Sequence, residues 1–152
     1  LARHWLSLHS NLPPDLADQL LAAVRPSLPL QPAIRDLWRD HVLFTGNEVT
    51  GFLDFGAMRI DTPLTDIARL LGSLAQDDAT LRNIACDAYA EQIPLSPRER
   101  ELIDLLDHSG ALLGGWNWLD WLYVEQRQFP SLAAVQSRLN ELLHRRFANS
   151  WS

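Results

Sequence analysis

The sequence predicts a mainly α-helical fold with one small β-hairpin. Apolar residues recur at helical spacing over most of the chain, and we expect helices at residues 14–24, 66–75, 79–92, 97–108, 112–126 and 132–148. This spacing is lost between residues 26 and 63, where prolines and turn residues are frequent. Within that stretch a turn sequence separates two short apolar runs, which is typical of a hairpin.

The first expected helix runs from Pro14 to Val24. Its leucines fall at helical spacing, and Asp15 lies in the first turn, where the helix dipole favours an acid. The next segment, from Pro26 to Pro32, cannot be helical, because its prolines lack an N–H donor and restrict the residues that precede them. The chain therefore enters the irregular stretch in an extended form.

The expected hairpin consists of two apolar runs, residues 42–44 and 49–53, joined by Thr45-Gly46-Asn47-Glu48. Both runs are rich in β-branched and aromatic residues, which favour strands. A glycine followed by an asparagine suits the connection, since tight hairpin turns need residues that tolerate positive φ. The hairpin should separate one loop before residue 42 from another after residue 53.

Local signals mark two boundaries of the later helices. Ser96 and Glu99 form a capping-box pattern with Pro97 at the first helical position, so a helix should begin there. Ser109 and Gly110 are expected to end that helix, with the glycine as its C-terminal cap. The following helix carries three tryptophans that we expect to pack in its core: Trp116, Trp118 and Trp121.

The composition excludes several classes of protein. The 152 residues fit one ordinary domain, and 47% apolar with 21% charged residues indicates a globular chain. A net charge of −6 argues against a broad nucleic-acid surface, and no apolar run approaches the roughly 18 residues of a membrane span. The single cysteine, Cys86, cannot form an internal disulfide, which favours a reducing, cytoplasmic setting.

Two aspartates stand at the ends of the expected hairpin. Asp36 lies five residues before His41, which opens the first strand, and Asp54 follows the second strand. Phosphoryl transfer needs an acceptor for a hydroxyl proton and anionic oxygens that hold Mg²⁺ on the nucleotide phosphates. A hairpin between the two loops should bring both carboxylates to one site, within roughly 10 Å of each other.

Residues 34–72 resemble the aminoglycoside phosphotransferase and choline kinase-like family. The resemblance rests on three motifs in the family's order and spacing: Ile34-Arg35-Asp36-Leu37-Trp38-Arg39-Asp40-His41-Val42-Leu43-Phe44, Leu53-Asp54-Phe55-Gly56 and Thr62-Pro63-Leu64-Thr65-Asp66-Ile67-Ala68. It implies a protein-kinase-like phosphotransferase, of which residues 1–152 would form the C-terminal, catalytic-loop lobe as a single domain. The implied activity is phosphoryl transfer from ATP, with Mg²⁺, to a hydroxyl of a small-molecule acceptor.

The resemblance also implies roles for individual residues. Asp36 occupies the position of the catalytic base and Asp54 that of the magnesium ligand, with simple loop capping as the alternative for both. Asp66 matches an acid that braces the catalytic loop through hydrogen bonds, although its place at the start of a helix equally suits an N-cap. Arg35 precedes Asp36 as in protein kinases, and a solvated surface arginine is the alternative. The residues that bind the acceptor stay unknown at this point.

Two residues depart from the family pattern. Ile34 replaces a histidine that orients the loop, and His41 replaces an asparagine that is the second magnesium ligand. Magnesium prefers oxygen, and an imidazole nitrogen is a poor partner for it. Three interpretations stay open: His41 holds a phosphate or water, Asp54 holds the metal alone, or Asp40 supplies the missing oxygen. A catalytically impaired, kinase-derived binding or interaction module is the alternative function.

The parts that clamp the nucleotide in this family are not evident in the sequence. There is no Gly-rich phosphate loop ahead of Asp36 and no strand-borne lysine with a helical glutamate partner. In the family these parts belong to an N-terminal lobe. We therefore expect that lobe in a longer parent protein, which would be the active enzyme, and we expect the 152 residues alone to be inactive.

Overall fold

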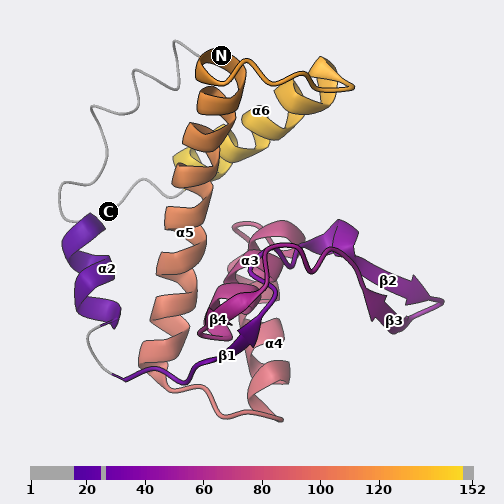
Figure 1. The fold of residues 1–152 in the computed structure, drawn as a ribbon. Coiled ribbons are helices and arrows are strands. Elements are labelled where there is room, and N and C mark those ends of the chain that lie inside the picture. The colour runs from indigo at the N-terminus through magenta and orange to yellow at the C-terminus, as the bar shows by residue number, and fades with distance from the viewer. Residues whose placement is uncertain (1–15, 25–26, 149–152) are drawn as a thin grey trace. The chain divides into compact units, whose positions relative to one another are not determined.

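A computed structural model describes residues 16–24 and 27–148, and within them the chain is mostly helical (Figure 1). The helices are α2 (Leu16–Val24), α3 (Leu64–Leu74), α4 (Ala79–Ala90), α5 (Pro97–Leu119) and α6 (Leu132–Ala148). Two short helical turns are η1, a 3₁₀ turn (Arg39–His41), and η2, a π-helical turn (Asp120–Val124). The strands are β1 (Gln31–Ala33), β2 (Val42–Thr45), β3 (Glu48–Phe52) and β4 (Arg59–Asp61). The expected start of the first helix, at Pro14 and Asp15, lies outside the described residues.

The expected hairpin is confirmed. β2 and β3 pair antiparallel, with Val42 opposite Phe52 and Thr45 opposite Glu48. Gly46 has a φ of 62° at the first position of the two-residue turn, a conformation that glycine adopts at little cost. Most side chains of the two strands are exposed. The turn and the backbone pairing therefore define this hairpin more than burial does.

A second strand pair, which the sequence did not predict, lies just before the first loop. β1 pairs antiparallel with β4, with Pro32 opposite Ile60 and Ala33 opposite Arg59 (Figure 1). A proline is tolerated there because both strands of a two-stranded sheet are edge strands. Ala33 is fully buried, at 0% exposure. The pair therefore fixes the backbone immediately before Ile34.

One hydrophobic core lies under helix α3. Its buried residues come from α3, α4 and α5 and are Leu64, Ala68, Leu71, Cys86, Leu102 and Ile103. Burial raises the pKa of the Cys86 thiol, which keeps the thiol protonated and unreactive. This core holds α3 in place, and α3 in turn supplies polar side chains to the loops beside the hairpin.

Helix α5 corrects one prediction. The sequence predicted a helix end at Ser109 and Gly110 with a new helix from Leu112, but α5 continues through all three residues. A glycine within a helix costs about 1 kcal/mol relative to alanine. The neighbouring Ala111 and Leu112 are buried, and burial of a leucine alone stabilises by roughly 1.5–3 kcal/mol. Packing therefore outweighs the local preference of the glycine.

A second hydrophobic core lies between the end of α5 and helix α6. Its buried residues are Ala111, Leu119, Val135, Leu139 and Leu142. Trp116 and Trp118 pack against it, and the ring of Trp118 makes an edge contact with Trp121 at a centroid distance of 5.2 Å. The predicted role in core packing is thus confirmed for Trp116 and Trp118, and Trp121 contacts Trp118.

The chain divides into two compact units. Among the described residues, one unit lies within residues 20–107, and the other joins residues 16–19 to residues 108–148. Every residue proposed for the site from the sequence falls in the unit of residues 20–107. In the described part of the chain, no helix has the length and apolar character that crossing a membrane requires.

The capping box at the start of α5 generates a pH-dependent prediction. The Ser96 hydroxyl donates to Glu99 Oε2 at 2.7 Å and accepts from the Glu99 N–H at 3.3 Å, while the Ser96 N–H donates to Glu99 Oε2 at 2.8 Å. The hydrogen bonds from the Ser96 side chain and then from its backbone lower the pKa of Glu99. Because the folded pKa is lowered, this stabilisation is present above the unfolded value of about 4.3 and is lost as the pH falls through the folded pKa.

We expect Ser96→Ala to destabilise the protein by about 1 kcal/mol at pH 7, and by less at pH 3. Ser131→Ala is the matched control, since Ser131 caps α6 by accepting from the Ala134 N–H at 3.2 Å with no acid in the third helical position. Its cost should not depend on the pH. Denaturant midpoints at the two pH values measure both effects, and an equal pH dependence for the two variants would contradict the prediction.

A buried ion pair between α4 and α5 generates the second prediction. Arg82 donates to Asp107 at 2.8 Å, and the two side chains are only 12% and 4% exposed. Burial lowers the pKa of Arg82, but the hydrogen bonds and charges of Asp104 and Asp107 outweigh burial, so that this pKa is raised. Removing one partner of a buried pair is costly because the other charge stays away from water.

Arg82→Met should therefore destabilise the protein by about 3–5 kcal/mol. Arg100→Met is its control, because Arg100 pairs with Asp87 at the same 2.8 Å while Asp87 is 70% exposed. An exposed pair contributes about 0–1 kcal/mol. Equilibrium denaturation of the two variants compares these costs, and a loss at Arg82 no larger than at Arg100 would show that burial of the pair is unimportant.

Candidate active site

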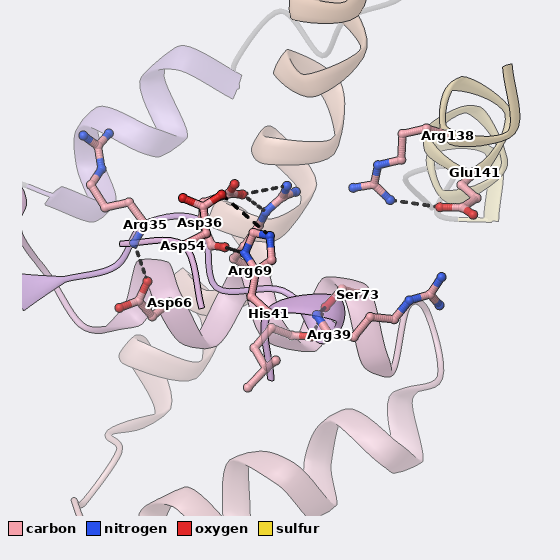
Figure 2. Close-up of polar contacts among 11 residues, drawn as sticks. Arg35, Asp36, Arg39, His41, Asp54, Asp66, Arg69, Ser73, Arg138 and Glu141 are labelled. Atoms are coloured by element: carbon pink, nitrogen blue, oxygen red, sulfur yellow. Dashed lines mark hydrogen bonds and ion pairs between the residues drawn. The ribbon is translucent and has the colours of Figure 1, made fainter. Parts of the chain in front are cut away.

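Asp36, His41 and Asp54 converge on one place, as Figure 2 shows. One carboxylate oxygen of each aspartate and one ring nitrogen of His41 all lie within 4.8 Å of one another. This meets the expectation that the hairpin brings the two acids within reach of a single phosphate. Asp36 precedes β2 and Asp54 follows β3, so the pairing of these strands is what brings the two loops together.

The first loop is held by Asp66 from helix α3. The two oxygens of its carboxylate accept from the backbone N–H groups of Ile34, at 2.8 Å, and Arg35, at 2.7 Å. The N-cap position of α3 is occupied by Pro63, without a side-chain cap. The two interpretations of Asp66 are thereby separated: its side chain bonds to the loop and does not cap its own helix.

Arg35 also contributes to the shape of this loop. Its backbone has a φ of 66°, in the left-handed region that a non-glycine residue adopts only at some cost. Its guanidinium pairs with Asp61 at the end of β4, at 3.1 Å. The backbone bond to Asp66 and this ion pair together hold the turn that presents Asp36.

The 3₁₀ turn η1 connects the first loop to the hairpin. The Arg39 N–H donates to the Ser73 hydroxyl at 3.0 Å, which ties the turn to α3. The His41 carbonyl accepts from the Leu53 N–H at 2.8 Å, which places the residue before Asp54 against the turn. The two loops are thus joined directly through the backbone of His41.

The ring of His41 lies between the two aspartates. Its Nδ1 is 2.8 Å from the backbone carbonyl oxygen of Asp36, and a carbonyl only accepts, so Nδ1 carries the proton and donates. Its Nε2 faces Asp54 Oδ2 at 3.9 Å. The side chain of His41 is 19% exposed, compared with 59% for Asp54. His41 is therefore a half-buried part of the site.

Asp54 is held in an unusual backbone conformation. Its φ is 60°, which aspartate and asparagine tolerate better than other non-glycine residues. Its Oδ1 accepts from the Gly56 N–H at 3.3 Å. A Cβ on Gly56 would also lie 3.3 Å from this Oδ1, which is close enough to disturb the carboxylate. The glycine of the Asp-Phe-Gly motif therefore leaves room for the acid.

Asp40, the further candidate for a metal ligand, lies outside this group. Its carboxylate pairs with the neighbouring Arg39 at 3.4 Å and is 62% exposed. In the described residues, the group of potential ligands consists of Asp36, His41 and Asp54. The structure therefore places His41, and not Asp40, beside the two acids.

Arg69 is a site residue that the sequence interpretation missed. Its Nε and Nη2 donate to Asp36 Oδ1 at 3.2 and 3.0 Å, and its guanidinium carbon lies 5.8 Å from the centre of the Trp38 ring. Residues three apart on a helix share a face. Since Asp66 was expected to face the catalytic loop, that spacing was the signal that could have found Arg69.

The brace made by Asp66 generates a third prediction. Asp66→Ala removes two charge-assisted hydrogen bonds, each typically worth about 1.5–3 kcal/mol, so we expect a loss of stability of about 2 kcal/mol or more. Asp40→Ala, which removes an exposed acid from the same loop, should cost under about 1 kcal/mol. Hydrogen exchange at the Ile34 and Arg35 amides, alongside denaturation, locates the change. Unaltered exchange in Asp66→Ala would show that the brace is unimportant.

Comparison with known proteins identifies a family and a relative. A curated homoserine kinase from Polaromonas naphthalenivorans (strain CJ2) is 36% identical to this chain over 91 residues. The matched part covers 56% of this chain and 29% of the relative, so the chain spans under a third of that relative's length. The model of the phosphotransferase enzyme family matches residues 2–102, which include all of the site. The chain therefore belongs to the phosphotransferase enzyme family.

Proposed function

We propose that the protein containing this chain transfers a phosphoryl group from ATP to a hydroxyl of a small molecule. The observation that carries this proposal is the convergence of Asp36 and Asp54 from two loops onto one place, in a chain of the phosphotransferase enzyme family. The name of the matched relative, homoserine kinase, supports a small hydroxyl compound as the acceptor and makes homoserine the first acceptor to test.

In the proposed mechanism, Asp36 is the catalytic base. The acceptor oxygen forms a bond to the γ-phosphorus, the bond from that phosphorus to the bridging oxygen breaks, and ADP leaves. The proton of the hydroxyl passes to the carboxylate of Asp36. Most of the catalytic effect of such a site comes from positioning, which Asp66 provides by holding the loop at Ile34 and Arg35.

The residues of the site fit a divalent metal ion. The carboxylate oxygens of Asp54 and Asp36 suit Mg²⁺, the ion that the family uses, whereas the nitrogen of His41 does not. A bound ion would neutralise charge on the phosphate oxygens of ATP. We propose that Asp54 is its main ligand, and that the Gly56 N–H fixes the direction of the Asp54 carboxylate.

Arg69 has a positioning role in this proposal. Both of its hydrogen bonds end on Oδ1 of Asp36, so the second oxygen of that carboxylate is not used by Arg69 and can receive the proton. The guanidinium carbon of Arg69 also lies 5.8 Å from the centre of the Trp38 ring. Packing and charge together thus fix the direction in which Asp36 presents its reactive oxygen.

We further propose that the two units form the C-terminal lobe of a kinase-like enzyme. In this family the nucleotide lies between two lobes, and the phosphates are covered from the N-terminal side. The 152 residues alone would then hold ATP weakly and transfer no phosphate. The lone, buried Cys86 supports a reducing, cytoplasmic setting.

The second candidate function is a catalytically impaired binding module. Two observations favour it: His41 stands where the family has asparagine, and Arg69 occupies one oxygen of Asp36. Such a module would keep the fold and lose phosphoryl transfer, so an assay of turnover separates the two functions.

We expect Asp36→Asn in the full-length protein to lower kcat by about 10²–10⁴-fold with little change in nucleotide affinity, because it removes the base and keeps the size. Asp54→Asn should lower kcat and also raise the metal concentration needed for half-maximal activity. Asp40→Asn is the matched control, an acid of the same loop outside the site, and should keep most of the activity. ADP release is measured with ATP and a panel of hydroxyl acceptors that begins with homoserine.

Two outcomes would overturn the proposal. Wild-type turnover in both site variants would show that these acids are bystanders. Binding of an acceptor by the full-length wild type, with no ADP release for any acceptor or metal, would favour the impaired module.

A further inference from the structure

His41 is oriented as metal-binding histidines are. Its Nδ1–H donates to the Asp36 carbonyl at 2.8 Å, which leaves the lone pair of the neutral ring on Nε2. Histidines that bind metals commonly donate their other ring N–H to a backbone carbonyl or carboxylate, which fixes the tautomer and the ring direction. The bond that would prepare Nε2 for a metal is thus already present.

The surroundings of Nε2 favour a cation between His41 and Asp54. Nε2 and Asp54 Oδ2 are 3.9 Å apart, which is too long for a hydrogen bond. Two ligands about 2.1 Å from a shared ion lie roughly 3–4 Å apart. An oxygen of Asp36 lies within 4.8 Å of both atoms, so an ion held by His41 and Asp54 would lie beside the proposed base.

The position of the ring is well defined by its contacts. The His41 N–H donates to the Trp38 carbonyl at 2.9 Å, and its carbonyl accepts from Leu53 at 2.8 Å. The Trp38 ring also packs edge-on against the imidazole, at a centroid distance of 6.1 Å. The side chain is therefore preorganised, and a metal would bind with little loss of side-chain freedom.

The carboxylate of Asp54 and the imidazole of His41 together form a mixed oxygen and nitrogen donor set. Magnesium is a hard ion that takes oxygen and gains little from the nitrogen. The divalent ions of the first transition series accept both donors, and their affinities rise from Mn²⁺ towards Cu²⁺. A site with oxygen donors alone lacks the nitrogen that favours these ions.

We propose that His41 is a metal ligand through Nε2, and that it shifts the ion preference of this site from Mg²⁺ towards a transition ion such as Mn²⁺. The proposal rests on the proposed function, because it assigns the ion of the same site. It replaces all three interpretations left open by the sequence, in which His41 holds a phosphate or water, Asp54 holds the metal alone, or Asp40 supplies the missing oxygen.

The test measures metal binding directly, in the full-length protein without nucleotide. Titration calorimetry gives the affinities for Mn²⁺ and Mg²⁺ in wild type and in His41→Asn. We expect the ratio of the Mn²⁺ to the Mg²⁺ affinity to fall by about tenfold or more in the variant, since one nitrogen ligand is removed. His108→Asn removes an imidazole on α5, outside the group of ligands, and should leave the ratio unchanged.

Pulsed electron paramagnetic resonance of bound Mn²⁺ provides a second readout. We expect a coupling to ¹⁴N of a coordinated imidazole in wild type and its loss in His41→Asn. Absence of this coupling, or an unchanged affinity ratio, would overturn the proposal and leave His41 as a residue that only packs between the two loops. Phosphoryl transfer without nitrogen coupling would refute this inference alone, whereas nitrogen-bound Mn²⁺ without any transfer would refute the proposed function alone.

Discussion

The carboxylate of Asp66 is the contact on which the geometry of the site depends. The loop that follows β1 makes a left-handed turn at Arg35, and its backbone N–H groups need acceptors. The N–H groups of Ile34 and Arg35 both donate to the carboxylate of Asp66. Asp66 lies in the first turn of α3, where the helix dipole stabilises a negative charge. Because the core beneath α3 fixes that helix, the loop takes its position from the core.

His41 connects the first loop to the second loop and so helps to position it. Its ring nitrogen bonds to the carbonyl of Asp36 and its own carbonyl receives the Leu53 N–H. One residue therefore joins the segment before β2 to the segment after β3 without relying on the exposed faces of the hairpin. An asparagine could keep the backbone bond, because that bond does not depend on the side chain. The link through the ring is specific to histidine.

Much of this arrangement was predictable, because it depends on contacts within short segments. The hairpin follows from the turn at Gly46, and the approach of Asp36 to Asp54 follows from the hairpin. The pairing of β1 with β4 was missed, since it joins segments distant in sequence and includes Pro32. The predicted helix end at Gly110 was wrong because α5 continues through the burial of neighbouring side chains, which is a tertiary effect. The spacing from Asp66 could have indicated the helix face of Arg69, but its partner, Asp36, follows only from the packed position of α3.

The left-handed backbone at Asp54 has a consequence for how this site can change during evolution. At φ 60°, aspartate and asparagine are accommodated more readily than longer side chains. Glutamate would keep the charge and strain the backbone, whereas asparagine would keep the backbone and lose the charge. Most single substitutions of Asp54 would therefore either strain the left-handed backbone or remove the negative charge. Under the metal assignment proposed above, a lineage would vary the metal preference more easily at position 41, which does not have a left-handed backbone, than at Asp54.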